Sequence, residues 1–147
     1  MFADFLSRLT RPTPDRLDEP DARLALAALL VRIARSDNDY AASERRRIAG
    51  ILHRRYGLDG DAGEHLLQQA EALEAEAPDT VRFTRAIKDA VAYEDRRAVL
   101  EAMWSVVLAD GTRSDEEDAL LRLVASLLGI SDRDSALARQ AAAQASG

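Results

Sequence analysis

The feature that most constrains the fold is a helical pattern that occurs twice along the chain, 73 positions apart. Residues 24–34 are apolar apart from one charge, Arg32, and residues 99–108 form a second, predominantly apolar segment. A short acidic segment and an amphipathic stretch follow each of them, the first with Ile48 and Leu52 on one helix face. Each unit alone would leave its apolar helix exposed, so the pattern predicts that the two units pack against each other.

The correspondence runs through the whole of each unit, which we place at about residues 22–58 and 96–130. Acidic and glycine positions recur in both units: Asp37 aligns with Asp110, Glu44 with Glu117 and, after one deletion, Gly57 with Gly129. Glycine commonly ends a helix because it adopts the left-handed backbone conformation without a steric cost. Each unit is therefore predicted to be an apolar helix, an acidic turn, an amphipathic helix and a glycine cap.

Composition supports a single all-α domain over residues 1–147. Apolar residues make up 47% of the chain, while its seven glycines and four prolines are too few for a turn-rich β protein. We expect a short helix and a linker over residues 1–19, where Pro12 and Pro14 interrupt the chain. We also expect the last helix to fray over the alanine-rich residues 141–147.

Charge and residue types exclude several classes of function. The chain has no cysteine, which excludes disulfides, thiolate zinc sites and cysteine nucleophiles. Its net charge of −6 argues against nucleic-acid binding and against direct binding of an oxyanion. Uncharged stretches such as Leu24–Val31 are far shorter than the roughly 20 residues that span a bilayer, so we expect no stable membrane insertion. Residues 1–9 lack the features of a secretory signal, and the expected location is cytoplasmic.

Two short motifs carry a family resemblance. They are Ile33–Asp37 with Glu44, and Leu108–Gly111 with Glu116 and Glu117, followed by Leu127–Gly129. Together they resemble the tellurite-resistance TerB-like family, whose relatives include an N-terminal module of membrane-anchored DnaJ-like co-chaperones. The resemblance covers about residues 22–132 and implies a multihelical fold with two central helices and pseudo-twofold repeats. It also implies a stress-associated or regulatory role and a divalent-metal site.

The acidic residues around the two turns are the candidate ligands of a divalent cation: Asp37, Asp39, Glu44, Asp110 and Glu117. Hard cations such as Ca²⁺ and Mg²⁺ prefer oxygen ligands, and two turns at the ends of packed central helices could share one ion. The spacing from the aspartate to the glutamate is too short for an EF-hand loop. A softer metal is disfavoured because the chain lacks cysteine and neither of its two histidines has a ligand partner nearby in sequence.

The same acids also have a structural interpretation. Acidic residues in the first helical turn cap free amide groups and oppose the helix dipole, and Ser114 with Glu117 forms a capping box. Capping does not explain Asp37 or Asp110, because both are expected at helix C-termini, where negative charge is unfavourable. A cation site and a purely structural role both stay open.

The remaining features favour a non-enzymatic module that binds a protein partner. No pattern places an acid and a base across a cleft, so we assign no catalytic residues and keep a carboxylate-based hydrolase only as a distant alternative. Arg45–Arg47, Arg54 and Arg55 make one helix basic, whereas residues 59–79 hold seven carboxylates and no lysine or arginine. This polarity could bind a protein partner or a second copy of the chain as a homodimer, or it could join two neighbouring helices of one molecule.

Overall fold

The computed structural model describes residues 3–9, 18–35, 42–77, 79–107 and 115–146, and within these ranges it contains eight α-helices and no strand. The helices are α1 (Ala3–Leu9), α2 (Glu19–Ala34), α3 (Ala42–Tyr56), α4 (Gly60–Glu76), α5 (Thr80–Ala90), α6 (Tyr93–Val107), α7 (Asp115–Leu127) and α8 (Asp132–Ser146). The prediction of an all-α fold is confirmed. None of the helices in the described ranges is long and apolar enough to cross a membrane.

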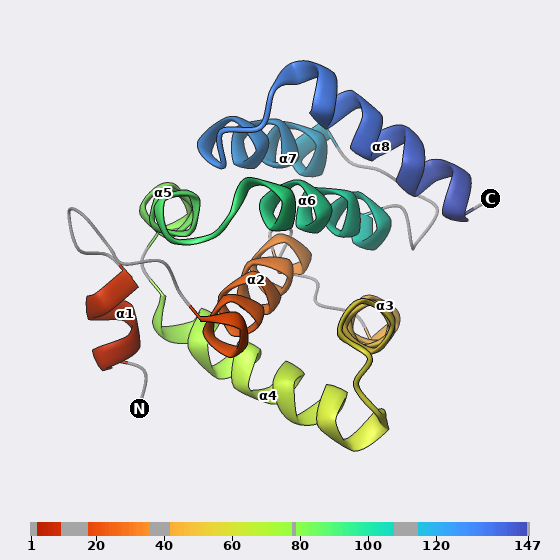
Figure 1. Ribbon diagram of the computed structural model, residues 1–147. Helices are drawn as coiled ribbons and strands as arrows, with labels where there is room; N and C mark the ends of the chain where they lie inside the picture. The colour runs from red at the N-terminus through yellow and green to blue at the C-terminus, as the bar shows by residue number, and fades with distance from the viewer. Residues whose placement is uncertain (1–2, 10–17, 36–41, 78, 108–114, 147) are drawn as a thin grey trace.

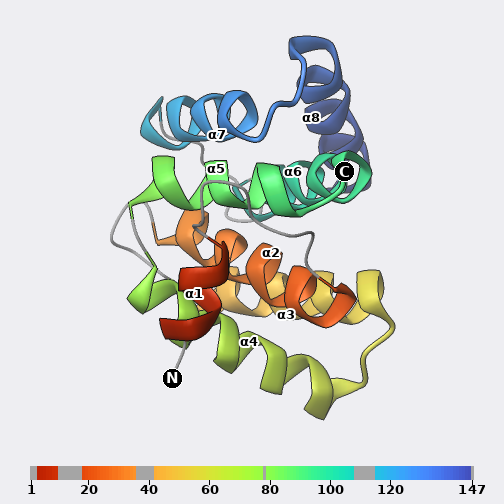
Figure 2. The same cartoon turned by 60° about the vertical axis from the view of Figure 1, so that its left-hand side comes forward.

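Helix α2 lies at the centre of the molecule, between α4 on one side and α6 on the other (Figures 1 and 2). Every residue from Ala25 to Val31 is at most 2% exposed, so this stretch of the helix has no face toward solvent. It is surrounded because α2 contacts α3, α4, α5, α6 and α7. The second central helix is α6, where Met103 and Trp104 are buried.

Corresponding helices of the two sequence units make corresponding contacts. Helix α3 packs on α2, and α7 packs on α6. The two most extensive helix pairs are α2 with α4 and α6 with α8. The helix that follows each unit, α4 or α8, therefore covers the central helix of that unit. The halves meet where α2 contacts α6. A pseudo-twofold rotation between the halves remains a prediction.

The ends of the helices explain why the chain divides at these positions. Asp18, Asp59 and Asp79 each accept a hydrogen bond from the backbone N–H three residues later, at 3.0, 2.8 and 3.0 Å. The Oγ of Ser131 accepts in the same way from the Asp134 N–H at 3.1 Å. These side chains satisfy amide groups that have no partner within their own helix. Asp59 is the N-cap of α4, so this helix begins at Gly60.

Gly57 and Gly129, which the duplicated pattern predicted as caps, both have positive φ, at 64° and 73°. At Gly129 the N–H of Ile130 donates to the Ala125 carbonyl and the N–H of Gly129 donates to the Ser126 carbonyl, at 2.9 and 3.0 Å. This is the Schellman arrangement, which ends a helix and turns the chain. Arg96 stabilises the same corner, since its guanidinium donates to the carbonyls of Leu128 and Val91.

The two ends of the described chain pack more closely than their composition suggests. In α1, Phe5 and Leu9 are buried, and the helix contacts α5. Helix α8 continues to Ser146, beyond the point where we expected fraying to begin. The physical reason is that Ala142 is only 2% exposed and belongs to the main hydrophobic core.

Candidate functional site

The structure describes one of the five predicted cation ligands. Asp37, Asp39 and Asp110 lie outside the described residues, and so does the side chain of Glu117. Glu44 lies in the first turn of α3 and is only 6% exposed. The relative positions of the five acids therefore remain a prediction.

The burial of Glu44 is the property that the sequence did not indicate. An ionised carboxylate removed from water is strongly destabilised unless it gains a cation or hydrogen-bond donors. The positive end of the α3 dipole supplies part of this stabilisation, because Glu44 is in the first helical turn. Glu44 also has at least one polar or electrostatic interaction within the protein. A buried carboxylate thus follows directly after the segment that holds Asp37 and Asp39.

Within the described parts of the chain, no three residues among His, Cys, Asp and Glu come together in a way that could hold a metal ion. This finding applies to Glu44 but not to the four other candidates, which lie wholly or partly outside those parts. His53 and His65 are both exposed, as expected for residues without a ligand partner.

A buried ionic cluster lies at the C-terminal end of α2, and sequence reasoning missed it. Glu74, from the end of α4, is 8% exposed and accepts a hydrogen bond from Arg32 Nε to its Oε1 at 2.7 Å. Its Oε2 accepts from Arg35 Nη1 at 3.2 Å. Arg32 also donates to the Glu74 carbonyl at 3.2 Å and to the Thr80 hydroxyl at 3.3 Å. The cluster joins α2 to the end of α4 and the start of α5.

The basic face of α3 and the acidic face of α4 pair within the molecule. Arg45 donates to Glu64 at 2.6 Å and to Glu71 at 3.1 Å. The hydrogen bonds that Arg45 donates to Glu64 and Glu71 raise the pKa of its guanidinium, and the hydrogen bond from Arg45 lowers the pKa of the Glu64 carboxyl. The interpretation of this polarity as two neighbouring helices of one chain is confirmed for Arg45.

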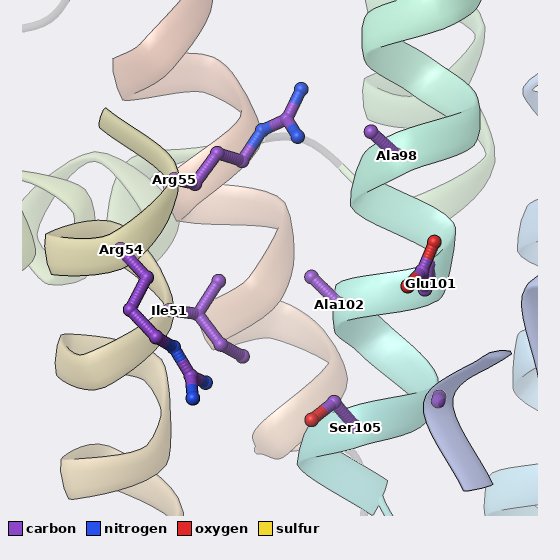
Figure 3. A pocket seen from close by; sticks show the side chains of 8 residues that line it. Ile51, Arg54, Arg55, Ala98, Glu101, Ala102 and Ser105 are labelled. Carbon is purple, nitrogen blue, oxygen red and sulfur yellow. The ribbon is translucent and has the colours of Figure 1, made fainter. Parts of the chain in front are cut away.

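A pocket of about 390 Å³ lies on the other side of α3, between α3, α6 and the end of α8 (Figure 3). Its lining residues are Ile51, Arg54, Arg55, Ala98, Glu101, Ala102, Ser105 and Ala142. Figure 3 shows Ile51 and Ala102 directed toward each other from α3 and α6. The sequence contains no motif for this pocket, because it arises from the packing of three helices that are far apart in the chain.

The family assignment follows from comparison with known proteins. A family model described as tellurite resistance protein TerB matches residues 23–140. The chain belongs to the TerB family. The match covers both acidic turns of the sequence pattern and all five candidate ligands. It also covers every helix from α2 to α7 apart from the first turn of α2. Comparisons with curated proteins and with solved structures gave no match.

Proposed function

We propose that this TerB-family protein is a non-catalytic stress-response or regulatory module that binds a divalent cation through its two acidic turns. Asp37, Asp39 and Asp110 would supply carboxylates that follow the central helices, and Glu44 and Glu117 would supply carboxylates from α3 and α7. Carboxylate oxygens suit Ca²⁺ or Mg²⁺. The family match supports the proposal because it spans both turns.

The observation that carries the proposal is the burial of Glu44. A glutamate that only caps a helix can stay in water and still oppose the helix dipole. At 6% exposure Glu44 is instead buried, and in the sequence it follows the segment with Asp37 and Asp39. A cation shared by these groups would offset the desolvation of Glu44 and link the end of α2 to the start of α3. Such a link would order the surface that meets a protein partner.

A second candidate function is a purely structural or protein-interaction domain. One observation favours it: Asp18, Asp59 and Asp79 all act as N-caps, so this chain repeatedly uses acidic side chains to start helices. In that case Glu44 and Glu117 stabilise α3 and α7 and bind no ion.

Titration calorimetry with Ca²⁺, Mg²⁺, Mn²⁺ and Zn²⁺ distinguishes the two functions. The test variant is Asp110→Asn/Glu117→Gln, and the control is Asp61→Asn/Glu76→Gln, which removes the same charge from exposed positions on α4. Cation binding predicts a saturable signal that the test variant loses and the control keeps. A cation at about 100 times its Kd should also stabilise the fold by about 2.7 kcal/mol. A melting temperature that stays unchanged with each ion at millimolar concentration would instead support the structural function.

A further inference from the structure

We propose that the pocket between α3, α6 and α8 binds a small organic anion, a carboxylate with a short apolar body. The apolar part of the lining is Ile51, Ala98, Ala102 and Ala142. Its volume of about 390 Å³ falls in the range of small-molecule sites, which is roughly 300–1,000 Å³. The proposal is independent of the acidic turns, because the pocket residues of α3 lie toward the opposite end of that helix from Glu44.

The polar groups on the lining determine which sign of charge fits. Arg54 and Arg55 come from the last turn of α3 and Glu101 comes from α6, so the lining carries two guanidinium groups and one carboxylate. Figure 3 shows the two arginine side chains extending away from each other along α3. Arg54 is exposed and has no hydrogen-bond or ion-pair partner within the described ranges. Arg55 lies 3.6 Å from the half-exposed Asp95 and over the Tyr56 ring, 5.6 Å from its centroid, so Arg54 is the more available of the two. A guanidinium without a partner presents a fork of donors that matches a carboxylate.

The shape of the pocket limits the size of the ligand. On α6 the lining runs from Ala98 to Ser105, which corresponds to about 10 Å along a helix. Helix α8 bounds the pocket through Ala142, whose small side chain is 2% exposed. The three alanines leave room that a larger side chain would fill. A ligand with an apolar body of about this length and one anionic end matches both the length and the charge.

The electrostatic prediction has two opposite signs, which makes it specific to this pocket. Arg54→Gln removes a charge-assisted hydrogen bond and should weaken binding of an anion about tenfold, given that the site is exposed to solvent. Glu101→Gln removes a like charge and should tighten binding roughly two- to fivefold. Arg46→Gln changes the net charge as Arg54→Gln does, but at an exposed position of α3 outside the pocket, and should change nothing.

The experiment uses the dye anilinonaphthalenesulfonate as a fluorescent organic anion, with octanoate and octanol as competitors. We expect saturable binding of one dye per chain, displacement by octanoate, and about tenfold weaker displacement by octanol, which has the same chain but no charge. Ala102→Leu should abolish dye binding while circular dichroism shows an unchanged helix content. The proposal is overturned if no saturable binding is seen at about millimolar dye, if Arg54→Gln and Glu101→Gln shift the affinity in the same direction, or if octanol competes as well as octanoate.

Discussion

Replacing Glu74 with glutamine tests whether the ionic cluster at the end of α2 stabilises the fold. The change keeps the size of the side chain but leaves Arg32 and Arg35 with a neutral partner. Glu74 has 9% of its side chain exposed, Arg32 has 18% and Arg35 has 40%, so water can replace the lost interaction with Arg35 but little of that with Arg32. Removing one partner of a buried ion pair costs about 3–5 kcal/mol.

The expected loss for Glu74→Gln is somewhat smaller, at about 2–3 kcal/mol. Glutamine retains an oxygen that can accept from Arg32, and Arg32 keeps its bonds to the Glu74 carbonyl and the Thr80 hydroxyl. For a chain of this size the loss corresponds to a fall of roughly 5–10 °C in melting temperature. Urea unfolding followed by circular dichroism measures the free energy directly.

Glu64→Gln is the matched control, on the same helix and with the same chemistry. Its partner Arg45 is about one-third exposed and keeps its bond to Glu71, so the loss should be far smaller and should disappear at about 1 M salt. The loss for Glu74→Gln should persist in salt. The reasoning is refuted if Glu74→Gln lies within about 0.5 kcal/mol of the wild type, or if salt removes both effects alike.

Two further predictions concern pH and backbone conformation. Pairing with Arg45 lowers the folded-state pKa of Glu64 below the ordinary value of 4.5. The stabilisation of the fold by this pair is therefore fully present above pH 4.5 and is lost as the pH falls through the lowered pKa. The melting temperatures of wild type and Glu64→Gln should therefore converge in acid, and a gap that widened would contradict this. Gly57→Ala and Gly129→Ala should each cost about 1–2 kcal/mol in urea unfolding, since both have positive φ. Gly129→Ala should destabilise the fold more than Gly57→Ala, because a Cβ at position 129 would lie 2.9 Å from Lys88 Cε and 3.3 Å from the Arg96 guanidinium. Equal losses of stability would show that these two side chains move aside freely.

Local signals in the sequence were sufficient for the helices and most of their ends. Gly57 and Gly129 were predictable because a left-handed residue at the end of an amphipathic helix has few alternatives to glycine. Asp59 and Asp61 both suit the start of α4, and only the backbone path shows that Asp59 is the N-cap. Fraying from Ala141 was expected from composition, and composition does not show that Ala142 meets the core.

Contacts between distant parts of the chain were not predictable in the same way. Arg32 stood out in an apolar helix, yet its partner Glu74 lies 42 positions away among seven carboxylates of the same segment. The sequence alone does not distinguish Glu74 from Glu71 or Glu76, because the choice depends on how α4 is rotated about its axis against α2. The burial of Glu44 and the pocket beside Ala102 depend on the same kind of information, namely how three or more helices pack.

The enclosure of α2 has a consequence for how the protein could respond to any ligand. Between Ala25 and Val31 the helix has close neighbours on every side, and shifting it would break contacts with five other helices at once. Amide hydrogen exchange should therefore be slowest there, since those amides open only when the whole domain unfolds. We therefore expect any conformational response to a ligand to consist of small rotations of the outer helices, while α2 keeps its position.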